Sequence, residues 1–134
     1  MEGTVPNNVS IFEKLMYGSL VLCVPFLYLV AQMLEPQAPG TLTYILQWGL
    51  ISLTLSILLI WLIARRGKNW ARWTWAIAYL LNLVPSIFQQ MEWYSKNLPV
   101  AILASTILLM HGIALCLLFT GNARPWFKKT ASAA

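Results

Sequence analysis

The residues best placed to do chemistry are His111 and Asn82, which fall near the middle of two long apolar segments. An ionisable group inside a membrane segment is a functional hypothesis by default, for instance a step in a proton relay. The alternative is structural: a neutral imidazole that hydrogen-bonds Asn82 or a backbone carbonyl joins two helices, for about 1 kcal/mol or less. A transporter usually also needs a carboxylate at this depth, and all four glutamates lie near segment ends or in connections. The pattern therefore favours the structural alternative.

The sequence offers too few groups for the common kinds of active site. It has one histidine, two cysteines and no aspartate, whereas a metal site needs three or four ligands. Nucleophilic catalysis needs a base and an orienting acid, and no acid lies near His111 in the sequence. Cys23 and Cys116 fall inside apolar runs, so we expect buried free thiols. We predict no catalytic residue, no metal site and no cofactor, and therefore not an enzyme.

Two short stretches combine cations with aromatic residues. The first is made of Arg65, Arg66, Lys68, Trp70, Arg72 and Trp73, and the second of Arg124, Trp126, Lys128 and Lys129. Each basic residue near an anionic lipid surface contributes about 1 kcal/mol, so these residues are candidate headgroup contacts. The alternative is that they only anchor the chain and fix its topology. The net charge of +5 is concentrated here, so we do not interpret it as nucleic-acid binding.

A third candidate is the polar stretch of residues 89–98, which we predict to be a loop. It contains Glu92, Trp93 and Tyr94. An amphipathic aromatic loop could dock a partner protein, or it could form part of an interfacial aromatic belt.

The composition places all these residues in a membrane protein. Hydrophobic residues make up 59% of the chain and charged residues 10%, whereas a soluble domain carries about a quarter charged residues. Four apolar segments have close to the roughly 20 residues that cross a bilayer core of about 30 Å. They are residues 15–34, 42–63, 70–88 and 100–119. We predict an all-α fold, with residues 1–134 forming a single integral membrane domain, an antiparallel four-helix bundle.

Local signals predict where these helices begin and end. Ser10 with Glu13 fits a capping box before the first helix. Residues 35–40 are rich in proline and glycine and interrupt the chain after it. Asn97 followed by Pro99 favours the start of the fourth helix, and Gly121 favours its end.

The distribution of Lys and Arg predicts the orientation. Lys14, the connector of residues 65–72 and the tail of residues 124–129 fall on one side, and Lys96 falls on the other. Since Lys and Arg are retained on the cytoplasmic side, both termini are expected in the cytoplasm.

Small residues predict which faces pack together, because helices in lipid associate by close approach. Three stripes stand out: Gly49, Ser52 and Ser56; then Thr74, Ala78, Asn82 and Ser86; then Ala101, Ser105, Gly112 and Cys116.

Two motifs carry a resemblance. Residues 67–72 (Gly-Lys-Asn-Trp-Ala-Arg) and residues 117–120 followed by 124–127 (Leu-Leu-Phe-Thr and Arg-Pro-Trp-Phe) resemble short four-span bacterial inner-membrane proteins. The resemblance implies a bacterial inner membrane and carries over no catalytic residue. The chain is also similar in size to small multidrug transporters, but Glu13 lies before the first span rather than within it.

These observations lead to one main hypothesis and its alternatives. The main hypothesis is a non-catalytic, multi-pass inner-membrane protein that acts by binding, as an accessory subunit of a membrane complex or an immunity-type protein. Its expected partners are anionic lipid headgroups and either another membrane protein or further copies of itself. The alternative is a small oligomeric transporter or channel that uses His111 and Asn82. A membrane-permeabilising protein of the phage type is a third possibility.

Overall fold

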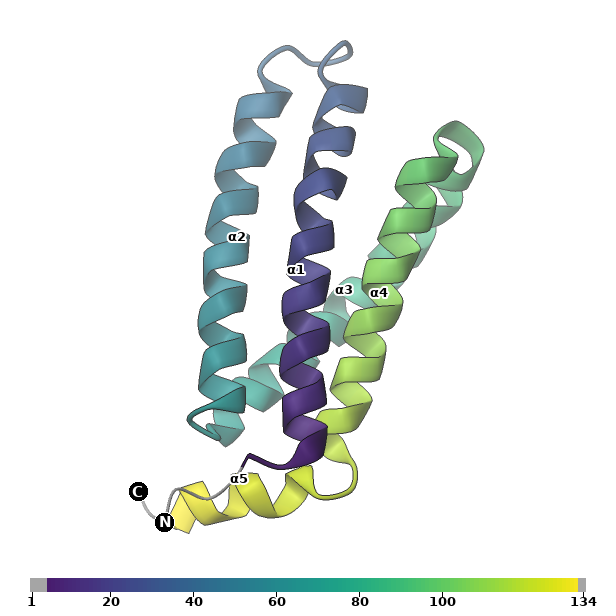
Figure 1. The fold of residues 1–134 in the computed structure, drawn as a ribbon. Helices are drawn as coiled ribbons and strands as arrows, with labels where there is room; N and C mark the ends of the chain where they lie inside the picture. Colours follow the sequence, from purple (N-terminus) through teal and green to yellow (C-terminus); the bar gives the residue numbers. More distant parts are fainter. Residues whose placement is uncertain (1–4, 133–134) are drawn as a thin grey trace.

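The computed structural model describes residues 5–132, and every regular element in this part of the chain is a helix (Figure 1). The helices are α1 (Asn7–Leu34), α2 (Thr41–Ala64), α3 (Asn69–Lys96), α4 (Leu98–Phe119) and α5 (Ala123–Ser132). The prediction of an all-α protein is confirmed. Within the described residues, α1, α2 and α4 are the three helices that are long and apolar enough to cross a membrane.

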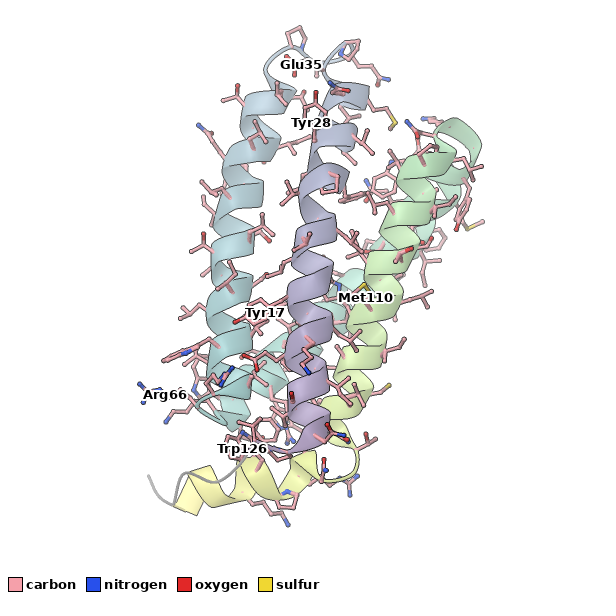
Figure 2. The ribbon with its side chains drawn as sticks, in the orientation of Figure 1. Tyr17, Tyr28, Glu35, Arg66, Met110 and Trp126 are labelled. Atoms are coloured by element: carbon pink, nitrogen blue, oxygen red, sulfur yellow. The ribbon has the colours of Figure 1, made fainter. Side chains whose placement is uncertain are left out.

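The four long helices alternate in direction along the chain, and α5 lies across one end of them (Figure 1). Helix α1 packs against α2 on one side and α4 on the other, α3 packs mainly against α4, and α2 has fewer contacts with α3. We call the end with the α2–α3 connector and α5 the basic end, and the end with the α1–α2 and α3–α4 connections the Glu35 end. In Figure 2, Arg66 and Trp126 lie at the basic end and Glu35 at the other.

The first helix is longer than predicted. It begins at Asn7, its N-cap is Pro6, and no side chain caps it, so the predicted capping box is wrong. Ser10 lies inside the helix, and the Glu13 carboxylate instead accepts a hydrogen bond at 3.0 Å from Arg65 Nε, which forms an ion pair between α1 and the end of α2.

The third helix also continues beyond its predicted end at residue 88. It reaches Lys96, so most of residues 89–98 are helical and the predicted loop is wrong. Residues 89–96 are polar but contain neither glycine nor proline, and an ion pair between Glu92 and Lys96 supports the last turn. Asn97 alone separates α3 from α4, and its side chain caps α4 by accepting from Val100 N at 3.3 Å.

The short fifth helix was not predicted. Pro125 is tolerated because it lies in the first turn of α5, where its missing N–H costs little. Phe127 is buried and Arg124 and Lys128 are exposed, so α5 has an apolar face toward the long helices and a basic face away from them. Gly121 makes the turn before it with a φ of +58°, and a Cβ there would meet Asn8 Nδ2 at 2.8 Å. The Asn8 side chain donates in turn to the Thr120 carbonyl at 3.1 Å.

The packing core lies at the basic end. Large side chains with no exposed surface come from α1, α2 and α4, and Phe127 of α5 closes the cluster with 3% exposure. The cluster includes Phe12, Met16, Ile60, Ile63 and Leu118. Toward the Glu35 end the buried residues are mostly small, for example Ala31, Gly49 and Ala104.

The predicted small-residue stripes describe the packing only in part. Gly49 is buried and faces Leu27 of α1, as expected, but Ser52 is exposed. On α3 the prediction is wrong: Thr74, Ala78 and Asn82 are exposed. The buried residues of α3 are Ala71 and Ala76, and its aromatic side chains Trp75, Tyr79 and Trp93 contact α1 and α4.

Candidate functional site

Helices α1, α3 and α4 enclose a cavity of about 270 Å³ that is open on one side. His111 and Asn82, the two residues singled out from the sequence, both line it. The remaining lining is partly aromatic and partly polar and carries no charged side chain: Cys23, Phe26, Tyr79, Ser86, Gln89, Gln90, Trp93, Ala104, Ile107 and Leu108.

His111 is held in place by α1 rather than by Asn82. Its Nε2 lies 3.3 Å from Ser19 Oγ, and the Ser19 hydroxyl donates its one proton to the Met16 carbonyl at 2.7 Å. The His111 ring also hydrogen-bonds the Ile107 backbone of its own helix. Ser19 has no exposed surface. The contact therefore ties α4 to α1, which agrees with the structural alternative but with a different partner.

Asn82 forms no hydrogen bond to His111 among the described residues. Its Nδ2 donates to the Ala78 carbonyl of its own helix at 2.8 Å. A primary amide has two N–H groups and one acceptor oxygen, so one N–H and the carbonyl of Asn82 remain free for a ligand or a partner.

The three residues of the predicted docking loop are helical and make contacts within the protein. The Trp93 ring meets Phe26 of α1 edge to face, with centroids 5.5 Å apart. The Ser105 hydroxyl donates to Gln90 Oε1 at 2.9 Å, so the Tyr94 hydroxyl, also at 2.9 Å, donates to Ser105. Glu92 pairs with Lys96. A free loop that presents Glu92, Trp93 and Tyr94 to a partner is therefore not present.

Among the basic residues, Arg72 has a role inside the protein. Its guanidinium carbon lies 4.5 Å from the ring centres of both Phe119 and Phe127, and Nη1 donates to the Leu118 carbonyl at 3.3 Å. A cation over an aromatic face and near the C-terminal carbonyls of a helix is favourable. Arg72 thus joins α3, α4 and α5. It was predicted as a headgroup contact, but its guanidinium is engaged within the protein.

The other arginines at the basic end differ in the contacts that their side chains make within the protein. Arg65 pairs with Glu13, and Arg124 Nε donates to the Phe119 carbonyl at 3.0 Å. The Arg66 guanidinium lies 5.0 Å from the Trp61 ring centre, and the side chain points away from the helices (Figure 2).

Most of the remaining predicted headgroup contacts have exposed side chains. Lys68, Trp70, Trp73 and Lys128 are exposed, and Trp73 also meets Phe119 at 5.1 Å. Trp126 packs against the core cluster. Lys129 is helical, and its side chain lies outside the described part of the protein.

At the opposite end, Glu35 forms the turn between α1 and α2. Its carboxylate accepts from Leu42 N at 2.6 Å and from Gly40 N at 3.0 Å. The hydrogen bond from Leu42, followed by that from Gly40, lowers the pKa of Glu35. A carboxylate at this position also matches the positive end of the α2 dipole.

No three His, Cys, Asp or Glu side chains of the described residues lie close enough to hold a metal ion. Both cysteines are free thiols. Cys23 is half-buried and lines the cavity, whereas Cys116 is exposed, so the expectation of a buried thiol at Cys116 is wrong.

The residue most clearly missed by sequence reasoning is Ser19. A single serine in an apolar run is common, and no sequence pattern shows which helix it will meet. Gln89 and Gln90 were assigned to a loop, because a polar pair near a glutamate resembles a connection more than the wall of a cavity.

No protein family model, no curated protein and no solved structure matches this chain. The resemblance to short four-span inner-membrane proteins therefore remains a prediction.

Proposed function

We propose that this chain is a non-catalytic protein of the bacterial inner membrane that crosses the bilayer four times and acts by binding another membrane protein. Both termini lie in the cytoplasm, and the exposed cations of the basic end contact anionic headgroups there. The partner protein covers one face of α3. The chain would act either as an accessory subunit of a membrane complex or as an immunity-type protein.

The geometry of α3 supports a fourth crossing. Helix α2 ends at the basic end and α4 begins at the Glu35 end, and α3 joins them with short connections. Its 28 residues span about 42 Å at 1.5 Å per residue, which exceeds a bilayer core of about 30 Å. If α2 and α4 both cross the membrane as antiparallel neighbours of α1, α3 must cross as well.

The observation that carries the proposal is the exposed polar face of α3. Thr74, Ala78, Asn82 and Gln89 fall within one sector of the helix at 100° per residue, and all four are exposed. Asn82 and Gln89 also line the cavity, so the part of this sector outside the cavity runs through Thr74 and Ala78. Another sector of exposed apolar residues suits lipid: Ile77, Val84, Phe88 and Met91. Polar surface in hydrocarbon is costly, so the part of the polar sector at Thr74 and Ala78 is the one that a partner helix covers. Ala78 lets a helix approach closely.

Site-specific photocrosslinking in living cells tests this proposal. A photoreactive residue in place of Thr74 is expected to give a protein adduct, and one in place of Val84, in the apolar sector, is expected to label lipid. Ala78→Phe blocks close approach and lowers the adduct yield from position 74, whereas Val84→Phe leaves it unchanged. The same adducts from positions 74 and 84, or lipid adducts alone from both, would contradict the proposal.

One observation favours the alternative of a small oligomeric transporter: His111 and Asn82 line the same cavity. In that case the adduct from position 74 is a second copy of this chain. Flux through reconstituted vesicles would then fall in His111→Ala, and unchanged or absent flux removes the alternative.

A further inference from the structure

We propose that the cavity between α1, α3 and α4 is a binding site for an uncharged, ring-bearing lipid headgroup with carbonyl oxygens, the chemistry of a quinone. This inference goes beyond the partner protein proposed above and concerns a small ligand that reaches the cavity from the bilayer.

The lack of charge in the lining excludes the common ionic headgroups. The twelve residues that line the cavity include no Lys, Arg, Asp or Glu, and His111 is already hydrogen-bonded to Ser19. An ion enters such a site only at a high desolvation cost, since no opposite charge compensates it. A phosphate or an ammonium headgroup is therefore disfavoured, and a neutral one is accepted.

The polar groups that remain free include several hydrogen-bond donors. Asn82 keeps one N–H, and the Gln90 amide keeps its N–H groups because its carbonyl oxygen is taken by Ser105. Ser86 and Gln89 form no side-chain hydrogen bond to another described residue. Unpaired donors at membrane depth are costly, and ring carbonyl oxygens satisfy them.

The aromatic walls and the volume of the cavity fit a single ring of a ligand. Phe26 and Trp93 meet edge to face at the cavity, which offers aromatic faces and edges for a flat group to stack on. A volume of about 270 Å³ falls just below the roughly 300–1,000 Å³ of sites for whole drug-sized molecules. The cavity thus holds a headgroup, and the tail of the lipid leaves through the open side.

The other hollow of the surface has different chemistry. A groove of about 450 Å³ along α3 and α4 is lined mainly by leucine and isoleucine. Its polar groups Tyr79 and Thr120 are already bonded to the carbonyls of Leu108 and Cys116. This groove suits an acyl chain and offers no headgroup recognition, so the inference rests on the smaller cavity.

Binding of three probes with the same ten-carbon tail to the purified full-length protein tests the proposal. The probes are a decyl benzoquinone, decanol and decyl phosphate, and the readouts are equilibrium binding and quenching of tryptophan fluorescence. The quinone is expected to bind saturably and at least about tenfold more tightly than either other probe, since one lost hydrogen bond of about 1.4 kcal/mol is a tenfold change.

Two variants and a control locate the site. Asn82→Leu is expected to weaken quinone binding about tenfold, whereas Gln47→Leu, an exposed amide on α2, leaves it unchanged. Trp93→Phe keeps an aromatic wall, so the affinity persists and the quenching amplitude falls. Non-saturable quenching, equal binding of decanol, tighter binding of decyl phosphate, or equal effects of Asn82→Leu and Gln47→Leu would each overturn the proposal. Because the assay contains no other protein, its failure leaves the proposed partner interaction standing.

Discussion

The two ends of this protein are built differently. At the basic end, α1, α2, α4 and α5 bury large side chains around Phe12, and Arg72 binds three helices together. Toward the Glu35 end, α3 has moved away from α2 (Figure 1), the buried residues are small, and a polar cavity opens. Tight packing fixes one end while looser packing leaves room for a ligand or partner at the other. The following predictions test this division of roles, from the largest expected effect to the smallest.

The first prediction compares two phenylalanines of α1. Phe12 has no exposed surface, whereas Phe26 is half-buried beside a cavity that already exists. Phe12→Ala is expected to lower the free energy of unfolding by about 3 kcal/mol, because the core cannot refill the space, and Phe26→Ala by about half as much or less. Unfolding of both variants in detergent micelles measures the difference. Equal losses would show that the two ends are packed alike.

The second prediction concerns the attachment of α5. Arg72→Met removes the cation between Phe119 and Phe127 and the hydrogen bond to the Leu118 carbonyl. We expect a loss of about 1–2 kcal/mol and faster proteolysis in α5.

The control for this variant is Lys68→Met, which changes an exposed cation of the same connector and is expected to have almost no effect. If Lys68→Met accelerates cleavage of α5 as much as Arg72→Met does, general charge and not the specific contact holds this helix.

The smallest effect is expected at Glu35. Its pKa is lowered by hydrogen bonds from Leu42 and Gly40, so its stabilising contribution is complete above its ordinary value of 4.5 and is lost as the pH falls below that. Thermal unfolding at pH 7 and at pH 3.5 is expected to show a larger difference for the natural chain than for Glu35→Gln. Glu92→Gln, which alters a pair on the exposed surface, serves as the control. Identical pH dependence in the natural chain and Glu35→Gln would show that the Glu35 carboxylate does not stabilise the turn.

The sequence predicts the type and number of long helices well, because hydropathy and helix propensity act locally. It does not predict which faces meet. The predicted stripe of α3 includes Ala78 and Asn82, yet the ring contacts and hydrogen bonds are made by Trp75 and Tyr79 on the neighbouring face. The small residues that are buried on this helix are Ala71 and Ala76, and neither belongs to the predicted stripe.

The same limit applies to the site residues. The sequence draws attention to His111 and Asn82, since polar groups are rare at that depth, and both do line the cavity. The partner of His111 depends on the rotation of α1, which no local signal encodes. Helix α5 was not predicted, because cations and aromatic residues after a span are equally typical of a juxtamembrane anchor. Its apolar face is defined by the burial of Phe127 in the core cluster, which is a tertiary contact.

Whether α3 crosses the membrane is tested most directly by the accessibility of the lysines at its two ends, Lys68 and Lys96. In a chain whose two cysteines are replaced by serine, Lys68→Cys and Lys96→Cys are labelled with an impermeant maleimide in intact spheroplasts. A crossing by α3 predicts labelling at position 96 from outside the cell, and labelling at position 68 only after the membrane is opened. Labelling of both positions, or of neither, in intact spheroplasts would place the two ends of α3 on one side of the membrane and would contradict a fourth crossing.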